Sequence, residues 1–536
     1  MIGGPWVDQY PPATETVLPP VTDDIVSHLG LETVDPDRIA MRCHGRTLTY
    51  GRLIEAHRRV AAGLAGAGLG PGDRVAVIAG TGPEHLIALL AALRLGAIVV
   101  EHDTAATSHE LAGLFADHGA RLAFTDPEVA PRVPGDVRTV VLTGEHRAAP
   151  AHPPGSPVWA DLSGHAPLGD EAPRPAPQDT ALLLYTSGST GRPKGVPFTH
   201  AMIGHAIDQN LNFFRMQGRG DGRHYLTLPL NHVFALVDQL FSALARAVEL
   251  IAFRRGDIDA VVAAAATRPP RKLGTVPPVL DAIAAGAARA GVRFDDLYVA
   301  TGGLPLTRRT VDAWLRISDS PPVNGWGMTE SCGYGLMPLP DPARVPAGSC
   351  GVPLPDLDVR VCDPADPTRE LGVGETGELQ LRGRLVFGGY WNDPRATAEA
   401  FTRDGFLRTG DLVSMDGQGF FFFHGRLKEI ISVQGENVSP VEVERVLEAA
   451  PGIARAFVYP RETTPGVNIL LAAFTAAPGT AADPDAALAL CAERLAPYKV
   501  PMRLTRVDAL PLSAAGKLRR DVDGQAWTRA HRVRGH

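Results

Sequence analysis

A short stretch after Leu184 combines hydroxyl groups, glycines and one lysine at close spacing. Serine and threonine hydroxyls donate hydrogen bonds, glycines let the backbone approach a ligand, and a lysine adds one compact positive charge. The residues are Thr186, Ser187, Gly188, Ser189, Thr190, Gly191 and Lys194. Residues 182–184 are all leucine, so the stretch follows an expected buried strand. We predict that this loop binds a polyphosphate.

The spacing of this loop differs from that of the P-loop. From Gly188 onward it reads Gly-x-x-Gly-x-x-Lys-Gly, whereas the Walker pattern is Gly-x-x-x-x-Gly-Lys-Ser/Thr. Pro193 and Pro197 also argue against a helix that starts directly after the loop. The alternative is a flexible Ser/Gly linker, but linkers rarely follow a buried strand or carry a lysine at a set position.

Residues 185–196, Tyr-Thr-Ser-Gly-Ser-Thr-Gly-Arg-Pro-Lys-Gly-Val, resemble a signature of the adenylate-forming (AMP-binding) superfamily. This superfamily contains acyl-CoA synthetases, adenylation domains of peptide synthetases and luciferases. The resemblance covers residues 25–525, nearly the whole chain. It implies an AMP-forming ligase of the acyl-/aryl-CoA branch, which activates a carboxylic acid with ATP, releases pyrophosphate and transfers the acyl group to the thiol of CoA.

Residues 324–330, Asn-Gly-Trp-Gly-Met-Thr-Glu, resemble the second signature of the superfamily. The implied nucleotide contacts are Asn324, Gly325, Trp326 and Gly327. By this resemblance Trp326 stacks on adenine, Thr329 donates to the α-phosphate, and Glu330 holds Mg²⁺, a cation that takes carboxylate and phosphate oxygens. Most members have tyrosine in place of Trp326, a change that keeps a stacking face. The alternative is a surface turn with an incidental glutamate.

Three further segments match nucleotide-contacting segments of the superfamily. Gly302 and Gly303 follow an expected strand and are implied to line the adenine and the acid. Asp411 lies in a Thr-Gly-Asp motif and is implied to accept from both ribose hydroxyls, although a Gly-Asp pair alone more often marks a β-turn. Arg426 is implied to reach the ribose or a phosphate, and Lys428 matches an interdomain hinge.

Residues 510–520 contain Pro-Leu-Ser-Ala-Ala-Gly-Lys, which resembles the terminal motif Pro-x-Thr-x-x-Gly-Lys. The resemblance implies that Lys517 is catalytic, with its charge between the carboxylate and the α-phosphate during attack. The alternative is a solvated lysine in a basic tail. His232, in Pro-Leu-Asn-His, matches a residue that guards the acid site; the alternative is a structural histidine packed against an apolar helix.

The acceptor of the acyl group has several interpretations. Residues 432–440 resemble the loop that swings in for thioester formation, and Gly435 is implied to line the pantetheine tunnel. Several plant aryl-CoA ligases carry lysines where Ser432 and Gln434 stand, which weakens the CoA interpretation without removing it. One alternative is transfer of the acid, or of another oxyanion such as nitrite, to an amine or a carrier protein. Another is a non-catalytic nucleotide-binding homologue.

The residues expected around the acid are small and apolar, with one aromatic. By their positions in the superfamily they are 275–278 (Thr-Val-Pro-Pro), 302–304 (Gly-Gly-Leu) and 333–335 (Gly-Tyr-Gly). We identify no aspartate at the position that peptide synthetases use for an α-ammonium group. The sequence therefore favours an aryl or medium-chain acyl carboxylate over an amino acid.

The composition limits the compartment and the partners. Of 536 residues, 45% are hydrophobic and 21% charged, and the formal net charge is −7. This balance is ordinary for a globular protein and gives no reason to expect nucleic acid. Five scattered cysteines without C-x-x-C spacing favour reduced thiols in the cytoplasm and argue against zinc. We predict no secretory signal and no membrane span, and expect a bacterial enzyme of secondary metabolism.

The expected fold is α/β. From Thr47 onward helix and strand patterns alternate, which predicts parallel sheets covered by helices. Residues 351–423 predict short antiparallel strands, similar to the small β-barrel-like subdomain of the superfamily. We therefore predict an N-terminal adenylation domain, residues 1–425, that binds ATP and the acid. A small mobile α+β domain, residues 426–536, is expected to carry the catalytic lysine.

Overall fold

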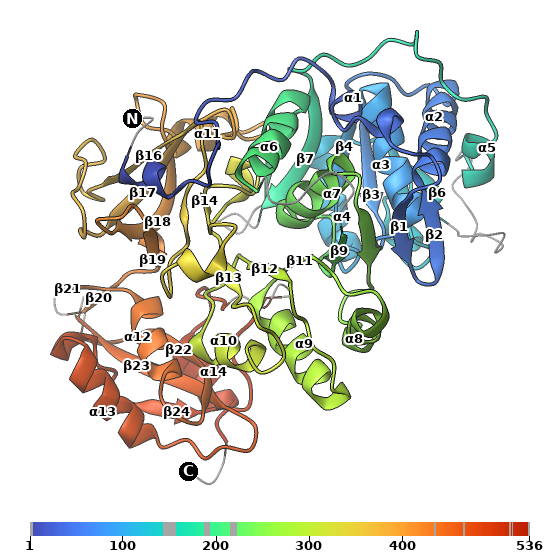
Figure 1. Cartoon of the computed structure of the whole chain (residues 1–536). Helices are drawn as coiled ribbons and strands as arrows, with labels where there is room; N and C mark the ends of the chain where they lie inside the picture. Colours follow the sequence, from blue (N-terminus) through green and yellow to red (C-terminus); the bar gives the residue numbers. More distant parts are fainter. Residues whose placement is uncertain are drawn as a thin grey trace.

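A computed structural model defines the arrangement of the chain (Figure 1). It describes residues 4–142, 157–186, 193–214, 222–433, 436–464, 467–513, 516 and 518–533. Two largely parallel sheets with their helices form the larger part of the molecule, and an antiparallel sheet and a C-terminal α+β unit follow. The α/β class predicted from the alternating pattern is confirmed.

The first sheet has six strands in the order β6-β5-β3-β4-β7-β8. In chain order they are β3 (Arg74–Ile78), β4 (Ile98–Glu101), β5 (Leu122–Thr125), β6 (Arg138–Val141), β7 (Thr180–Thr186) and β8 (Lys194–Thr199). All neighbouring strands are parallel except β7 and β8, which form an antiparallel hairpin. The helices that precede and connect its first strands are α2 (Tyr50–Gly66), α3 (Pro83–Leu95) and α4 (Ser108–His118).

The second sheet has seven strands in the order β13-β12-β11-β9-β10-β1-β2, parallel except between β1 and β2. They are β1 (Ile39–Cys43), β2 (Arg46–Thr49), β9 (Arg223–Leu226), β10 (Glu249–Ala252), β11 (Lys272–Thr275), β12 (Tyr298–Thr301) and β13 (Val323–Asn324). The associated helices are α6 (His200–Phe213), the π-helix η4 (Phe234–Phe241), α8 (Ile258–Thr267), α9 (Pro277–Ala290) and α10 (Arg308–Trp314). Open α/β sheets bind ligands beyond the carboxyl ends of their strands, so the segments after β11, β12 and β13 are the ones to examine.

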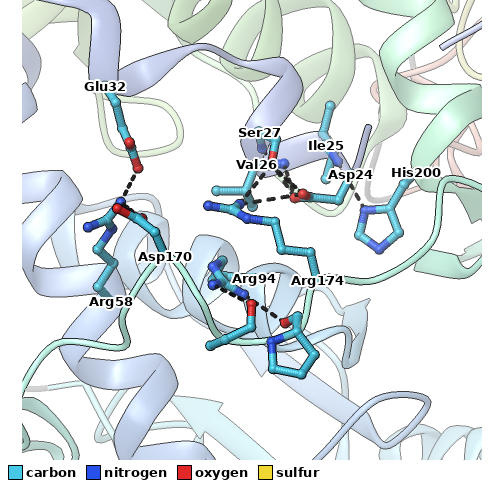
Figure 2. A network of polar contacts seen from close by, with 12 residues as sticks. Asp24, Ile25, Val26, Ser27, Glu32, Arg58, Arg94, Asp170, Arg174 and His200 are labelled. Atoms are coloured by element: carbon cyan, nitrogen blue, oxygen red, sulfur yellow. Dashed lines mark hydrogen bonds and ion pairs between the residues drawn. The ribbon is translucent and has the colours of Figure 1, made fainter. Parts of the chain in front are cut away.

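Both ends of the β7–β8 hairpin are tied to the short helix that begins at Ile25 (Figure 2). Upstream of β7, Arg174 donates to Ser27 Oγ at 2.7 Å and pairs with the buried Asp24 at 3.4 Å. Downstream of β8, His200 Nδ1 accepts a hydrogen bond from the backbone nitrogen of Ile25 at 3.2 Å. Because buried polar groups hold their partners strongly, this network anchors the segments before and after the hairpin.

Residues 357–426 form a four-stranded antiparallel sheet in the order β16-β17-β18-β19. Its strands are β16 (Leu357–Cys362), β17 (Gly377–Gly383), β18 (Leu407–Met415) and β19 (Phe421–Arg426). Strands β16 and β19 are its two edges, so the expected barrel-like subdomain is an open sheet over the described residues. Its last strand leads directly into the short helix η7 (Leu427–Glu429).

The chain beyond η7 builds an α+β unit with a hydrophobic core of its own. Its strands are β20 (Ile431–Val433), β21 (Glu436–Val438), β22 (Ile453–Thr464), β23 (Val467–Ala476) and β24 (Leu504–Arg506), and its helices are α12 (Pro440–Glu448), α13 (Pro484–Arg494) and α14 (Gly524–Ala530). Figure 1 shows this unit, in orange and red, on the side of the molecule where α10 and β13 lie. Among the described helices, none has the length and apolar character needed to cross a bilayer.

Candidate active site

The two ends of the predicted phosphate loop meet across the β7–β8 hairpin. Thr186 ends β7 directly opposite Lys194, which begins β8. A strand follows the loop instead of a helix, as the two prolines predict. The loop residues between them, Ser187, Gly188, Ser189, Thr190 and Gly191, lie outside the described residues. The hairpin therefore sets the position of the loop by its ends.

Tyr390 connects Lys194 to Glu330. The Lys194 ammonium lies over the Tyr390 ring, 4.7 Å from its centroid, and the Tyr390 hydroxyl donates to Glu330 Oε1 at 2.7 Å. Burial, and then the nearby Glu330 carboxylate, raise the pKa of Tyr390, so the phenol keeps its proton and acts as the donor. The structure thus brings together the residue predicted for phosphate and the residue predicted for magnesium.

The segment that carries Tyr390 was missed by sequence reasoning. Its backbone is fixed at both sides of the site: Trp391 N donates to Gly195 O at 2.8 Å, and Phe387 N donates to Glu330 O at 2.9 Å. The only signal in the sequence is an aromatic pair directly after two glycines, a pattern that also occurs in ordinary turns.

Trp326, Asp411 and Arg426 form a second group of predicted nucleotide contacts. Trp326 Nε1 donates to Asp411 Oδ2 at 2.8 Å, and Arg426 Nε lies 3.2 Å from the other carboxylate oxygen. Asp411 and Arg426 are paired across β18 and β19, so the sheet itself sets their separation. Asp411 is buried, whereas 46% of the Arg426 side chain is exposed, which leaves the guanidinium accessible to an anion.

Two turns meet at the carboxyl edge of the second sheet. Gly302 and Gly303 follow β12, and Gly303 has a positive φ of 75° that favours glycine. Gly325, after β13, donates from its nitrogen to Thr301 O at 2.8 Å. With its amide oriented to satisfy its neighbours, Asn324 donates to Thr301 Oγ1 at 2.8 Å. The predicted contacts on both turns therefore share one edge.

Gly333 packs between the turn that precedes Thr329 and Val233, the residue that follows His232. A Cβ added to Gly327 would lie 2.1 Å from Gly333 O, so the turn before Thr329 requires a glycine. On the other side, an ideal Cβ on Gly333 would lie 3.2 Å from Val233, the residue after His232. His232 is exposed and lies just before η4.

Lys428, the predicted hinge, interacts electrostatically with residues of both groups of predicted contacts. Burial, and then the charge of Arg426, lower the pKa of Lys428, and Lys194 lowers it further. Glu429 and Asp411 act in the opposite direction. A site in which cations repel one another in this way is suited to a polyanion, since binding one relieves the repulsion.

Lys517 and Gly435 lie outside the described residues, but the residue before Lys517 is described. Gly516 has a positive φ of 75°, and its carbonyl accepts from Arg455 Nη1 at 3.1 Å. An ideal Cβ on Gly516 would lie 3.9 Å from Pro278 Cγ, in the predicted wall of the acid site. Gly516 therefore lies beside a residue that is predicted to line the acid pocket.

The two basic residues after Lys517 differ, because Arg519 is exposed and Arg520 is held by ion pairs. Arg520 donates twice to Glu444, at 2.6 and 2.7 Å, and lies 3.4 Å from Glu429. Glu444 is buried in α12. Glu429 is the neighbour of Lys428. Arg520 therefore connects the motif that contains Lys517 to the predicted hinge, a link that the sequence interpretation missed.

The surroundings of Glu330 suit one kind of divalent-cation site. Glu330 is buried, and Tyr390 occupies one of its carboxylate oxygens. Within the described part of the chain, no group of three or more His, Cys, Asp or Glu side chains could hold a metal ion. Mg²⁺ often takes one or two carboxylates together with substrate phosphates and water. Glu330 therefore suits a nucleotide-bound Mg²⁺ and not an ion enclosed by protein.

Comparison with known proteins agrees with this arrangement. Residues 32–391 match the AMP-binding enzyme family, and residues 442–517 match the AMP-binding enzyme C-terminal domain. A feruloyl-CoA synthase from Amycolatopsis is 34% identical over 500 residues, which cover 90% of this chain and 95% of that protein. The indoleacetate–CoA ligase of Aromatoleum aromaticum is 30% identical over 497 residues, covering 92% and 95%.

Solved structures give the same fold. The ATP-bound MatB of Rhodopseudomonas palustris superimposes with a TM-score of 0.84 at 26% identity, covering 95% of this chain and 100% of that one. The anthranilate CoA ligase AuaEII, in complex with anthranoyl-AMP, superimposes with a TM-score of 0.84 at 22% identity, covering 97% and 99%. At that identity the second likeness concerns the fold alone.

Proposed function

The chain belongs to the AMP-binding enzyme family, and on this basis we propose that it is an ATP-dependent acyl- or aryl-CoA ligase. It joins a carboxylic acid to AMP, releases pyrophosphate and then passes the acyl group to CoA. The strongest support is the convergence of Lys194, Glu330 and Asp411, which come from three distant segments. The CoA ligases among its relatives support CoA as the acceptor.

In the first half-reaction a carboxylate oxygen attacks the α-phosphorus of ATP, and the bond to the β-phosphate oxygen breaks. Negative charge gathers on the α-phosphate oxygens and on the departing pyrophosphate. We assign Lys517 and Thr329 to the α-phosphate, and Lys194 with the loop at 186–191 to the pyrophosphate. Glu330 would hold Mg²⁺, which would neutralise further phosphate charge when bound.

The nucleoside is held by groups that are already oriented. Asp411 keeps accepting capacity for the ribose hydroxyls while it bonds Trp326, because a carboxylate has about four lone-pair sites. Trp326 offers an aromatic face for adenine, and Gly302 and Gly303 let the backbone approach it. His232, exposed before η4, guards the entrance to the acid.

In the second half-reaction the sulfur of CoA attacks the acyl carbonyl carbon, and the bond to AMP breaks. The thiol proton leaves and AMP departs with the oxygen that came from the acid. We propose that residues 426–536 rotate about Lys428 as a mobile domain against residues 1–425. This rotation withdraws Lys517 and brings Gly435 to the pantetheine.

ATP–pyrophosphate exchange over a panel of carboxylic acids tests adenylation, and product analysis with and without CoA tests the acceptor. We expect exchange that depends on the acid and an acyl-CoA that forms only when CoA is present. Consumption of the adenylate by an amine or a carrier protein, with no acyl-CoA, would replace CoA as the acceptor. ATP binding without exchange for any acid would indicate a non-catalytic nucleotide-binding protein.

We also propose that the enzyme works in the cytoplasm. The five cysteines, Cys43, Cys332, Cys350, Cys362 and Cys491, are all buried and unpaired. Free thiols of this kind suit a reducing compartment. Isolation of the protein from its source cells by fractionation, followed by thiol counting, tests the assignment.

A further inference from the structure

The last turn of α4 contacts two parts of the site that are far apart in the sequence. Asp117, the penultimate residue of this helix, accepts a hydrogen bond at Oδ2 from the Tyr185 hydroxyl at 2.6 Å. Its backbone carbonyl accepts from Asn392 Nδ2 at 3.2 Å. Tyr185 directly precedes Thr186 at the end of β7, and Asn392 follows the segment that carries Tyr390. One residue outside the predicted motifs therefore contacts both segments.

The same two segments contact each other at Gly195, which follows Lys194 in β8. Gly195 faces Tyr185 across the hairpin, and its carbonyl accepts from Trp391 N at 2.8 Å. An ideal Cβ on Gly195 would lie 3.0 Å from Trp391 Cβ and 3.3 Å from Tyr185 Cζ. The hairpin and residues 390–392 are therefore packed at a spacing that leaves little room for a side chain between them.

The ring of Tyr185 packs beside two buried histidines. Its centroid lies 5.9 Å from that of His102 and 6.0 Å from that of His118. His118 Nδ1 accepts from Ala120 N, so its proton is on Nε2, which donates to His102 Nε2 at 3.0 Å. Burial lowers the pKa of His102 to about 4 and that of His118 to about 2. These two neighbours therefore hold the ring without changing charge near neutral pH.

The stability of α4 does not explain an aspartate at position 117. The helix begins with a capping box formed by Thr107 and Glu110 and ends before Gly119, which has a positive φ of 62°. The carboxyl end of a helix carries partial negative charge and favours a cation, so a carboxylate is unfavourable there. The bond from the Tyr185 hydroxyl offsets this disadvantage, since hydrogen bonds to charged groups are stronger than those between neutral groups.

We propose that Asp117 is a positioning residue for phosphate binding, which holds the end of β7 and the segment that carries Tyr390 in a fixed relation. This inference rests on the adenylating function proposed above. Lys194, beyond the loop, lies over the Tyr390 ring, and the Tyr390 hydroxyl donates to Glu330. Binding groups keep their geometry only when supporting residues hold them. A shift of either segment would therefore separate the predicted pyrophosphate contact from the predicted magnesium ligand.

Tyr185→Phe tests this role, because it removes the hydroxyl and keeps the ring. In ATP–pyrophosphate exchange we expect the KM for ATP and for pyrophosphate to rise about five- to tenfold, and the KM for the acid to stay within about twofold of the native value. A loss of stability alone would lower the active fraction, and hence kcat, without changing any KM. Asp117→Ala should have the same effect, whereas Asp117→Asn keeps an acceptor oxygen and should restore most of the native KM.

Two further variants separate the links. The double variant Asp117→Ala, Tyr185→Phe should raise the KM for pyrophosphate no further than either single variant, because both remove the same bond. Asn392→Gly tests the second link. Asn392 has a positive φ of 52°, which glycine adopts without strain, so only the amide is lost. It should raise the KM for pyrophosphate about threefold, as expected for an exposed neutral hydrogen bond.

Asp73→Ala is the matched control for Asp117→Ala. Asp73 precedes β3 in the same sheet as β7, accepts from Gly70 N at 2.9 Å and lies 3.4 Å from Arg121. Its loss should lower stability and leave the KM for ATP and for pyrophosphate unchanged.

The two levels of inference fail differently. Native KM values in Tyr185→Phe and Asp117→Ala, additive effects in the double variant, or equal increases in the KM for pyrophosphate and for the acid would overturn the positioning role and leave adenylation intact. No exchange by the native enzyme with any acid, while ATP still binds, would overturn the proposed function. Calorimetry would then still test the positioning role, since Tyr185→Phe should weaken ATP binding by about fivefold.

Discussion

The nucleotide side of the site and the core around η4 differ in how some of their polar groups are bonded. On the nucleotide side Asp411 is bonded to Trp326, and Glu330 to Tyr390. In the core around η4 the amide of Gln239, a buried residue of this helix, has no hydrogen-bond partner among the described residues. Groups that are already bonded keep their geometry before the substrate arrives, whereas a buried amide without a partner lowers stability.

This difference corresponds to two tasks of the site, which are binding ATP and recognising the acid. ATP is the same for every member of the family, so its contacts can be fixed in advance by protein partners and recur as motifs. The acid varies between members, so the residues that contact it need not recur as motifs. Fixed geometry on the nucleotide side favours rate.

The largest effect is expected for Lys517, which we assign to the α-phosphate. Lys517→Ala should lower the rate of adenylate formation by about a thousandfold or more, because one preorganised charge at the developing phosphate charge is worth this much. ATP binding, measured by calorimetry, should be nearly unchanged. Thioester formation from added acyl-adenylate should also persist, since the lysine serves the first half-reaction only.

Lys499→Ala is the control for this variant. Lys499 lies in the same C-terminal unit, with its ammonium 2.8 Å from both oxygens of Glu442, partly exposed to solvent. Its loss should leave pyrophosphate exchange close to the native rate. Wild-type exchange by Lys517→Ala would show that Lys517 is not catalytic.

The next effect concerns the stability of the core around η4. Lys272→Met removes the cation from a buried pair and leaves Asp238 charged in the core, which should lower the free energy of unfolding by about 3 kcal/mol. The double variant Asp238→Leu, Lys272→Met should recover part of this loss, because neither charge is then stranded. Urea denaturation measures both. Equal destabilisation by the single and double variants would mean that the pair contributes through packing alone.

The sequence predicted the site more completely on the nucleotide side. Lys194, Trp326, Glu330 and Asp411 lie in segments whose residue types and order are distinctive, and the structure brings them together. Tyr390 was missed because an aromatic residue after two glycines has no distinctive pattern. Tyr390 matters because it contacts both Lys194 and Glu330, which are far apart in the sequence.

The core around η4 could not be predicted in the same way. In the sequence Gln239 is one polar residue in an apolar helical run, and nothing local tells whether its amide is bonded. That depends on Gly274 in another strand and on the turn of a π-helix. The alternation of helices and strands predicted the α/β class, but not whether the four-stranded sheet closes, since closure requires pairing between its first and last strands.

A smaller loss is expected for the ribose contact. Asp411→Asn removes the charge that Arg426 faces and the carboxylate that accepts from Trp326, while it keeps the shape of the side chain. The KM for ATP should rise by about tenfold, in line with the 1.5–3 kcal/mol of a hydrogen bond to a charged group. The preference among the carboxylic acids of the exchange panel should not change, because the partners Trp326 and Arg426 belong to the nucleotide-facing group. A changed preference would show that nucleotide binding and acid recognition are not independent.

The smallest effect is expected at Tyr390, which connects Lys194, the predicted phosphate contact, to Glu330, the predicted magnesium ligand. Tyr390→Phe keeps the ring over Lys194 and deletes only the hydroxyl that donates to Glu330. Because one intramolecular hydrogen bond contributes about 1 kcal/mol, the Mg²⁺ concentration needed for half-maximal exchange should shift by about fivefold, with the maximal rate nearly retained. Tyr225→Phe, which removes a hydroxyl bonded to Arg268 O away from the site, should leave that concentration unchanged. A Tyr390→Phe enzyme with native magnesium dependence would mean that Glu330 is held in place without this bond.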